Sequence, residues 1–425
     1  MVGLDHIIMD MENFAYQGAV LYASTNNTLT LTENTFQNNS AKLSGSALFA
    51  QHHNTVVIIE STFQNHSAPY GGALYAYSSN ILTISGNTFQ NNSADQGGGA
   101  LYVNVYNTLT LLDNIFQSNT VSELSGGALY VENQNTLIII ESKFQYNSAV
   151  YGGALYADSN NTLTISENTF WSNGAVISAG ALYVGINNTI TLSENTFQRN
   201  SGVYGGALHT YTNDTLNISE NTFQINSADT SGGALYADIN NIITLSENTY
   251  QNNSGLYGGV LYAYSNNILT ISGNTYQNNS GFYGGALSVR TNNTLTISES
   301  TFQCNSAHYY GGVLFAFTSN TLTLTGNTFE NNSSDEDGGA LAVRQSTMNL
   351  NSNNITGNVA HSIGGAVFSS DSNLSMHGSH SLQNNHAQFG GGIAAVECKI
   401  IIAGDFKLEN NKASWVEDYT LRCQI

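Results

Sequence analysis

The sequence repeats a short phrase every 26 to 28 residues, and this period restricts the possible folds more than any other feature. NTFQNNSA, centred on Phe36, returns around Phe89, and close variants surround Tyr276 and Phe329. A fixed period of this length is typical of solenoids, in which each repeat is one turn that stacks on the next. The anchor position of the phrase is aromatic or aliphatic throughout: Phe36, Phe63, Phe89, Phe116, Phe144, Phe170, Phe197, Phe223, Tyr250, Tyr276, Phe302, Phe329, Ile355, Leu382 and Leu408.

Two more phrases keep step with the anchor and have the pattern of short strands. GGALYA ends at Ala76 and returns ending at Ala157 and Ala237, while TLTIS occupies Thr162–Ser166. Apolar and polar residues alternate in each phrase, which is the period of a strand with one buried face. The sequence therefore predicts an all-β fold, a single right-handed parallel β-helix of about 15 turns, with 26–28 residues and three short strands per turn.

The repeat also suggests how the chain is divided. We expect residues 1–35 to form a truncated N-terminal turn, residues 36–407 the regular repeats, and residues 408–425 a degenerate C-terminal turn or cap. No basic segment followed by an apolar one stands at the start, so no signal peptide is visible, and the first turn is already under way at residues 14–23. We therefore expect a fragment of a longer protein, lacking its signal and anchor.

Asparagine and glycine dominate the corners between the phrases. Asparagine tolerates left-handed backbone conformations, and its amide can bond to the same asparagine one turn away. We therefore expect an internal ladder through Asn39, Asn92, Asn119 and Asn147. Glycine pairs such as Gly71-Gly72 and Gly152-Gly153 are expected where the chain turns too sharply for a Cβ.

The charge balance excludes one large class of partner. The chain has 9 Lys plus Arg against 29 Asp plus Glu, and its formal net charge is −20. Phosphate backbones repel such a polyanion, so we expect no nucleic-acid binding. No run of 18 apolar residues occurs, and we expect no transmembrane helix. Hydrophobic residues make up 41% of the chain, which is enough to fill a core.

The alternating phrases resemble the repeats of the polymorphic outer membrane proteins of chlamydiae. That family alternates an FxxN phrase with GGA followed by Ile, Leu or Val. Here Phe89 to Asn92 precedes Gly98-Gly99-Ala100-Leu101, and residues 223–226 precede 232–235 in the same way. The resemblance covers nearly the whole chain. It implies a parallel β-helix passenger at a cell surface or in the extracellular space, with adhesion to a host-cell or matrix protein or a glycan as its role.

The outward position of GGALYA forms a column of aromatic residues. Rings exposed at the strand spacing would stack on sugars or anchor a protein partner. The alternative is that the rings stack on one another and only stiffen the sheet. The tentative ligand-binding residues are Tyr75, Tyr102, Tyr130, Tyr156, Tyr183, Tyr236 and Tyr262, in a column that also includes Tyr22, Phe49 and Phe315.

A second column is acidic. Like charges one turn apart raise one another's pKa or recruit cations such as Ca²⁺. Solvated carboxylates that keep the β-helix soluble are the alternative, and we expect at most weak, non-specific divalent cation binding, with no cofactor and no specific metal site. The column contains Glu141, Glu167, Glu194, Glu220 and Glu247, with Glu33, Glu60, Asp113 and Glu299 at the same position.

Rows of threonines are a further candidate for a functional surface, and two cysteines are candidates for a disulfide. Outward rows through Thr162, Thr189 and Thr294, and through residues 164, 191 and 296, resemble the flat threonine face of ice-binding proteins, although threonine is also simply a good strand residue. Cys398 and Cys423 lie 25 residues apart, close to one repeat, and would form a disulfide if the setting is oxidising. The alternative is that both remain reduced.

An enzyme of the polysaccharide-degrading β-helix type needs converging carboxylates and a cleft walled by long loops. The turns here vary by only two residues, and Glu132 and Asp158 share a column with Arg290 and Arg344 without forming an acid and base pair. We therefore expect a monomeric β-helical rod that acts as an adhesin-like binding module and is not an enzyme. The alternatives are a spacer, an ice-binding surface or a polysaccharide-degrading enzyme.

Overall fold

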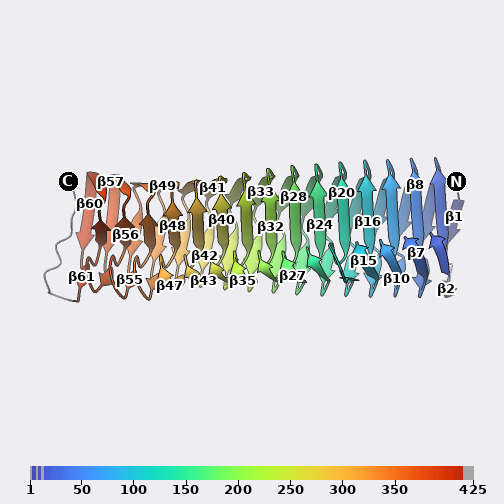
Figure 1. Ribbon diagram of the computed structural model, residues 1–425, viewed down its shortest axis with the longest axis horizontal. Helices are drawn as coiled ribbons and strands as arrows, with labels where there is room; N and C mark the ends of the chain where they lie inside the picture. Colours follow the sequence, from blue (N-terminus) through green and yellow to red (C-terminus); the bar gives the residue numbers. More distant parts are fainter. Residues whose placement is uncertain (1, 6–7, 11–13, 415–425) are drawn as a thin grey trace. The chain divides into compact units, whose positions relative to one another are not determined.

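The computed structural model describes residues 2–5, 8–10 and 14–414, with side chains from residue 16 onward. The chain divides into two compact units, Met1–Leu216 and Asn217–Ile425, and each is described separately. All regular secondary structure in the described residues is β-strand (Figure 1). Consequently, the described part of the chain contains no helix suited to crossing a membrane. The predicted all-β fold is confirmed.

One turn of the first unit shows how the repeat folds. It consists of β13 (Ile81–Ser85), β14 (Thr88–Gln90), β15 (Ser93–Gly97) and β16 (Leu101–Val105). β13 and β14 both belong to one sheet, here called sheet A, while β15 belongs to sheet B and β16 to sheet C. The strands of each turn therefore lie in three sheets, in keeping with the three strands expected, with sheet A containing two short strands. The TLTIS and NTFQNN phrases contain the two sheet A strands, and the GGALYA phrase contains the sheet C strand. The residues that follow the last asparagine of the NTFQNN phrase form sheet B.

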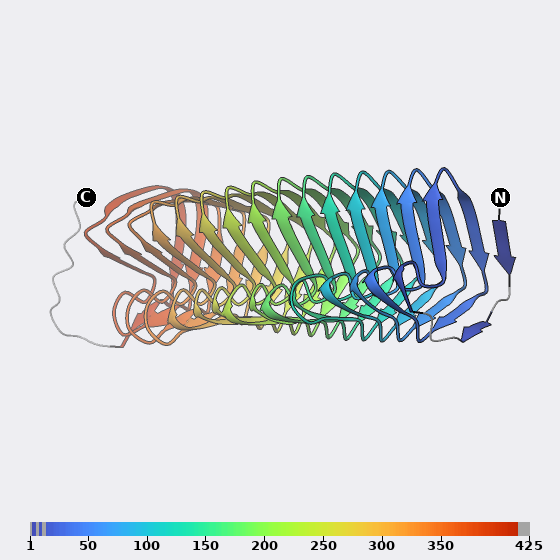
Figure 2. The same ribbon diagram turned by 45° about the vertical axis from the view of Figure 1, so that its right-hand side comes forward.

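The second unit repeats the same turn. Its β41 (Ile268–Ser272) and β42 (Thr275–Gln277) lie in sheet A, β43 (Ser280–Tyr283) in sheet B and β44 (Leu287–Thr291) in sheet C. Within each unit, every strand pairs in parallel with its counterpart one turn away, so that like positions face each other (Figure 2). Leu82 pairs with Leu109, and Tyr276 pairs with Phe302.

The anchor residues fill the interior, as predicted. Phe89 is fully buried and its ring stacks on Phe63 and Phe116, with ring centroids 4.8 and 4.9 Å apart. In the second unit, Tyr276 occupies the same position and stacks on Tyr250 at 4.8 Å. Parallel register thus turns a sequence repeat into continuous stacks of rings. Leu408 is the exception: 63% of it is exposed, because β60 (Lys399–Glu409) belongs to the last described turn and no described residue covers it.

Buried asparagines hold the corners. Asn92 donates from its backbone N–H and from Nδ2 to Oδ1 of Asn119, at 3.1 and 3.0 Å, and its Nδ2 also donates to the Phe63 carbonyl at 3.1 Å. Asn119 repeats these bonds with Asn147. The predicted ladder is confirmed, with His66 replacing asparagine in the turn after Asn39.

Two further asparagine ladders, which were not predicted from the sequence, lie at two other corners of the turn. One passes through Asn80 and Asn107, and the other through Asn87 and Asn114, with Nδ2 to Oδ1 distances of 3.1 Å in both. In all three ladders, the residue before the asparagine has a positive φ, as at Ser79, Gly86 and Asn91. Each corner therefore combines one left-handed residue with one buried amide.

The fourth corner, between sheets B and C, uses glycine instead. Gly71 has a φ of 60°, and a Cβ placed on Gly72 would lie 2.2 Å from the carbonyl oxygen of Gly99 one turn away. A side chain on Gly72 would therefore clash with the backbone of the adjacent turn. The expected need for glycine is confirmed at this pair.

We predict that Asn119→Ala destabilises the protein by about 2–4 kcal/mol, because the backbone N–H of Asn92, which bonds to its Oδ1, would be left buried without an acceptor. Asn91→Gly is the matched control: Asn91 is exposed and has a φ of 53°, which glycine adopts without strain. Thermal unfolding followed by circular dichroism should show a clear drop for Asn119→Ala alone. Equal melting temperatures for the two variants would contradict the role of the ladder.

Candidate binding groove

The tyrosine column lies on sheet C and points away from the interior, yet most of its rings are buried. Tyr102 is 7% exposed and stacks between Tyr75 at 4.9 Å and Tyr130 at 4.6 Å. Tyr70, from sheet B, packs edge-on against Tyr102 at 5.5 Å. Of the two interpretations of the column, the structure shows the rings stacked on one another and covered by neighbouring turns and sheet B side chains, while ligand binding by the column stays a prediction. Tyr75, Tyr102, Tyr183, Tyr236 and Tyr262 are buried, and Tyr130 and Tyr156 are half-buried.

The tyrosine hydroxyls bond to the next outward column of sheet C. The Tyr102 hydroxyl donates to Oε2 of Glu132 at 2.9 Å, and Asn104 donates to the Tyr75 hydroxyl at 2.8 Å. Burial is the main cause that raises the pKa of Tyr75 to about 12. Burial, followed by the charge of Glu132, raises the pKa of Asp158, while a hydrogen bond from Tyr130 lowers it. These contacts give the hydroxyls of Tyr75 and Tyr102 hydrogen-bond partners within the protein.

The arginines of this outward column lie in the second unit and are held by neighbours there. Arg344 lies over the Tyr310 ring at 4.1 Å, and its guanidinium is 3.9 Å from the Asp337 carboxylate. Arg290 lies over Tyr264 at 4.9 Å. Both guanidinium groups are therefore engaged by rings of the second unit.

The acidic column lies at the bend between the two sheet A strands of each turn. Its members are exposed and have left-handed backbone, with φ near 55° at Glu194 and Glu247 and 59° at Glu167. Glycine takes the same position at Gly86, Gly273 and Gly326. Among the described residues, no group of three or more His, Cys, Asp or Glu side chains is arranged to hold a metal ion. Weak cation binding stays a prediction.

The structure also shows where the threonine rows and two of the cysteines lie. Thr162 pairs with Thr189, and Thr164 with Thr191, on the outer face of sheet A. Cys398 is buried, with Sγ 3.3 Å from the Ser369 hydroxyl and 3.1 Å from the Val396 carbonyl. Cys423 lies outside the described residues, so the disulfide stays a prediction. Cys304 is exposed.

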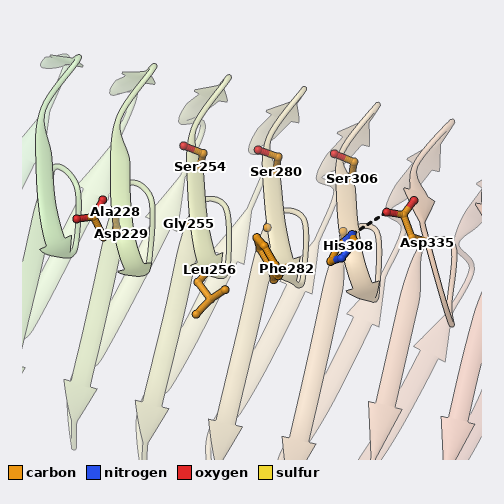
Figure 3. A pocket seen from close by; sticks show the side chains of 12 residues that line it. Ala228, Asp229, Ser254, Gly255, Leu256, Ser280, Phe282, Ser306, His308 and Asp335 are labelled. Atoms are coloured by element: carbon orange, nitrogen blue, oxygen red, sulfur yellow. Dashed lines mark hydrogen bonds and ion pairs between the residues drawn. The ribbon is translucent and has the colours of Figure 1, made fainter.

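An open groove of about 570 Å³ runs across sheet B of the second unit (Figure 3). It crosses β35 (Ser227–Ser231), β39 (Ser254–Tyr257), β43 and β47 (Ser306–Tyr310). One wall is a row of serines, and the small residues Ala228, Gly255, Gly281 and Ala307 stand between the two walls along each strand. The other wall consists of Asp229, Leu256, Phe282, His308 and Asp335.

Phe282 is the large apolar side chain that this groove exposes, with 44% of its surface accessible. Its ring meets His308 edge-on at 5.0 Å. Nδ1 of His308 lies 2.9 Å from Oδ2 of Asp335, and both side chains are exposed (Figure 3). The Ser306 side chain points away from His308, so the serine, histidine and aspartate do not form a nucleophilic triad.

Stacked tyrosines border the groove at the following position of the same strands. Tyr283 stacks on Tyr257 and on Tyr309, both at 5.1 Å. All three are half-buried. They form an aromatic stack on the same strands as the groove.

Sequence reasoning missed the groove because its wall has no shared residue type. Leu256, Phe282 and His308 look unrelated in the sequence, and only the parallel register places them side by side. A usable signal existed: each follows a ladder asparagine by three residues, as in Asn279-Ser280-Gly281-Phe282. The first unit has a smaller groove of about 280 Å³ at the same position, where Val176 is 71% exposed.

One turn of the first unit departs from the ladder pattern. Asp214 stands where asparagine is usual, accepts from the Asn188 backbone N–H at 2.7 Å and from the Thr210 hydroxyl at 2.8 Å, and is 1% exposed. Thr210 stands where the turn before it has Val184 and the turn after it has Ala237, so the two changes complement each other. Burial raises the pKa of Asp214 to about 6, although four hydrogen bonds lower it. On the same strand, buried His209 bonds to Ser178.

Comparison with known proteins identifies the fold family. The model for a right-handed β-helix region matches residues 13–197, 71–238 and 127–302, which together span more than half of the chain. The chain belongs to the right-handed β-helix family. The Chlamydia polymorphic membrane protein repeat matches residues 328–344, which confirms the resemblance on which the surface-protein expectation depends. None of the curated proteins compared matches the chain significantly.

Solved structures add little beyond the fold family. Crystal structures of the periplasmic alginate epimerase AlgG align with 90% of this β-helix protein and 76% of the epimerase. A single-residue mutant of that enzyme is 13% identical with a TM-score of 0.32, and the unmutated enzyme is 12% identical with a TM-score of 0.27. Such scores carry no argument about activity.

We predict that Tyr102→Ser destabilises the protein by roughly 2–4 kcal/mol, because the change removes a buried ring from a continuous stack. Tyr106→Ser is the matched control, since Tyr106 is 59% exposed. Melting temperatures measured by circular dichroism should fall for Tyr102→Ser and stay nearly constant for Tyr106→Ser. An unchanged melting temperature for Tyr102→Ser would show that the column does not support the fold.

We predict that Asp214→Asn stabilises the protein more at pH 7.5 than at pH 4. A folded-state pKa of about 6, above the unfolded value of about 3.9, means that the stability linked to the protonated carboxyl is complete below pH 4 and is lost as the pH rises through 6. Asparagine restores a neutral ladder residue at every pH. Melting temperatures of both proteins across this range provide the measurement, and an equal gain at both pH values would contradict the buried charge.

Proposed function

We propose that this β-helix protein is a surface or extracellular binding module of the adhesin type, and that it binds its partner through the sheet B groove of the second unit. The observation that carries the proposal is the exposed ring of Phe282, which lies in a groove between hydrogen-bonding side chains. Binding sites combine an apolar anchor of this kind with a few fixed polar groups. The polymorphic membrane protein repeat at residues 328–344 supports the surface location.

We also propose that the groove binds without catalysing a reaction. The groove contains one His308–Asp335 pair, and its volume is open to solvent along sheet B (Figure 3). Catalysis at a polar substrate needs converging groups in a site from which water is excluded. An open groove with a single aromatic anchor suits reversible adhesion better. A plain spacer, by contrast, has no need for an exposed phenylalanine beside a histidine.

We predict that Phe282→Ser lowers binding to a responsive cell or matrix surface at least tenfold, because the change removes the exposed anchor of the groove. Tyr106→Ser, which changes an exposed ring in the first unit, should bind like the wild type. Surface-binding assays on both variants, with melting temperatures to confirm folding, test this. If Phe282→Ser bound as tightly as the wild type, the groove would not be the binding site. If the wild type bound none of the surfaces, the result would favour the spacer alternative.

A further inference from the structure

We infer that the ligand of the sheet B groove is a linear glycan without acidic groups, lying along the groove with one sugar residue per turn. This inference rests on the proposed function and adds the chemical class of the ligand. Three properties of the groove lead to it: the repeated geometry of its walls, the state of its backbone groups and the charges at its ends.

The serine wall repeats with every turn, and the opposite wall keeps the same spacing with different side chains. Ser254, Ser280 and Ser306 pair in register on adjacent strands, so the same hydroxyl recurs at the strand spacing of roughly 4.8 Å. All three serines are exposed. The opposite wall advances by the same step through Leu256, Phe282 and His308 (Figure 3). A ligand built from identical units of similar length meets the same hydrogen-bonding partner at each step.

The paired backbone beneath the groove excludes strand addition, in which an extended peptide pairs with the edge of a sheet. Peptides that add to a sheet pair with the unsatisfied backbone groups of an edge strand. Here the groove crosses the face of sheet B, where the backbone groups are already bonded between turns: Ser280 N–H donates to the Asn253 carbonyl, and Ser306 N–H donates to the Asn279 carbonyl, both at 3.0 Å. Recognition must therefore come from side chains, as it does for sugar hydroxyls and ring faces.

An amphipathic helix is also a poor fit. A helix docks by inserting several apolar side chains into a hydrophobic groove. The sheet B groove offers Leu256 and Phe282 as its large apolar groups, between serines on one side and carboxylates at the ends. One exposed ring flanked by hydroxyls and a histidine suits a sugar, whose apolar face stacks on the ring while its hydroxyls bond at the edges.

The negative charges of the groove and of the whole chain determine which glycans the groove favours. Asp229 lies at one end of the groove and Asp335 at the other, and both are exposed. His308, the basic side chain of the lining, is already bonded to Asp335. The whole chain has a formal net charge of −20. Uronates and sulfated sugars are therefore repelled, and neutral or amine-bearing sugars are favoured.

Isothermal titration calorimetry on the full chain tests this inference with three probes: cellohexaose, a glucosamine hexamer and a galacturonate hexamer. We expect the neutral or the amine-bearing hexamer to bind and the galacturonate hexamer to bind at least tenfold more weakly. Affinity should rise with oligomer length and level off when the oligomer spans the four strands of the groove. Phe282→Ser should lower the affinity at least tenfold, and the matched control Tyr106→Ser should not.

Other outcomes overturn the inference and separate it from the proposed function. Tighter binding of galacturonate would contradict the charge argument. Absence of binding to all three hexamers, together with cell binding that still depends on Phe282, would contradict the glycan inference and would leave the proposed function intact. Hexamer binding that is unchanged in Phe282→Ser would place the glycan elsewhere. Asp229→Asn should weaken binding of the glucosamine hexamer alone, and an equal effect on cellohexaose would contradict electrostatic selection.

Discussion

Each turn of this β-helix has to change direction several times without leaving backbone groups unpaired in its interior, and the buried asparagines meet that requirement. An asparagine at a corner accepts on Oδ1 from the turn before it and donates from Nδ2 to the turn after it and to a neighbouring carbonyl, as Asn119 does with Asn92, Asn147 and Phe89. A shorter or apolar side chain leaves such groups unsatisfied. Three such ladders hold the corners, and they fix the register on which every other column depends.

The ladders also explain how outward positions can differ from one repeat to the next within this chain. Once register is fixed, any residue at a given outward position lies beside its counterparts from adjacent turns. Where the counterparts are alike, as in the Tyr102 stack or the Phe89 stack, they pack on one another and become structural. Where they differ, as at Leu256, Phe282 and His308, they form a surface with its own chemistry. The regular columns therefore build the fold, and the irregular one is the better candidate for recognition.

The same logic applies to the turn that contains His209, Thr210 and Asp214. A single asparagine replaced by aspartate leaves a carboxyl in a site built for a neutral amide, and a threonine hydroxyl at 2.8 Å partly compensates. Burial still dominates the pKa of Asp214, because its hydrogen bonds replace only part of the solvation that the charge loses. This departure from the strict repeat thus marks a place where stability is expected to depend on pH.

The sequence by itself determined the solenoid, its period, its interior anchors and one of its ladders, because each follows from identical residues recurring at a fixed interval. It also indicated the glycine pairs, whose backbone requirements are local. It could not decide the fate of outward residues. Tyr75 and Tyr102 alternate like exposed positions, but sheet B and their neighbours cover them, and burial of this kind depends on how the corner between sheets B and C folds. The groove likewise exists only in the assembled second unit, since stacking brings together Phe282, His308 and Asp335 from positions that are 26 and 27 residues apart in the chain.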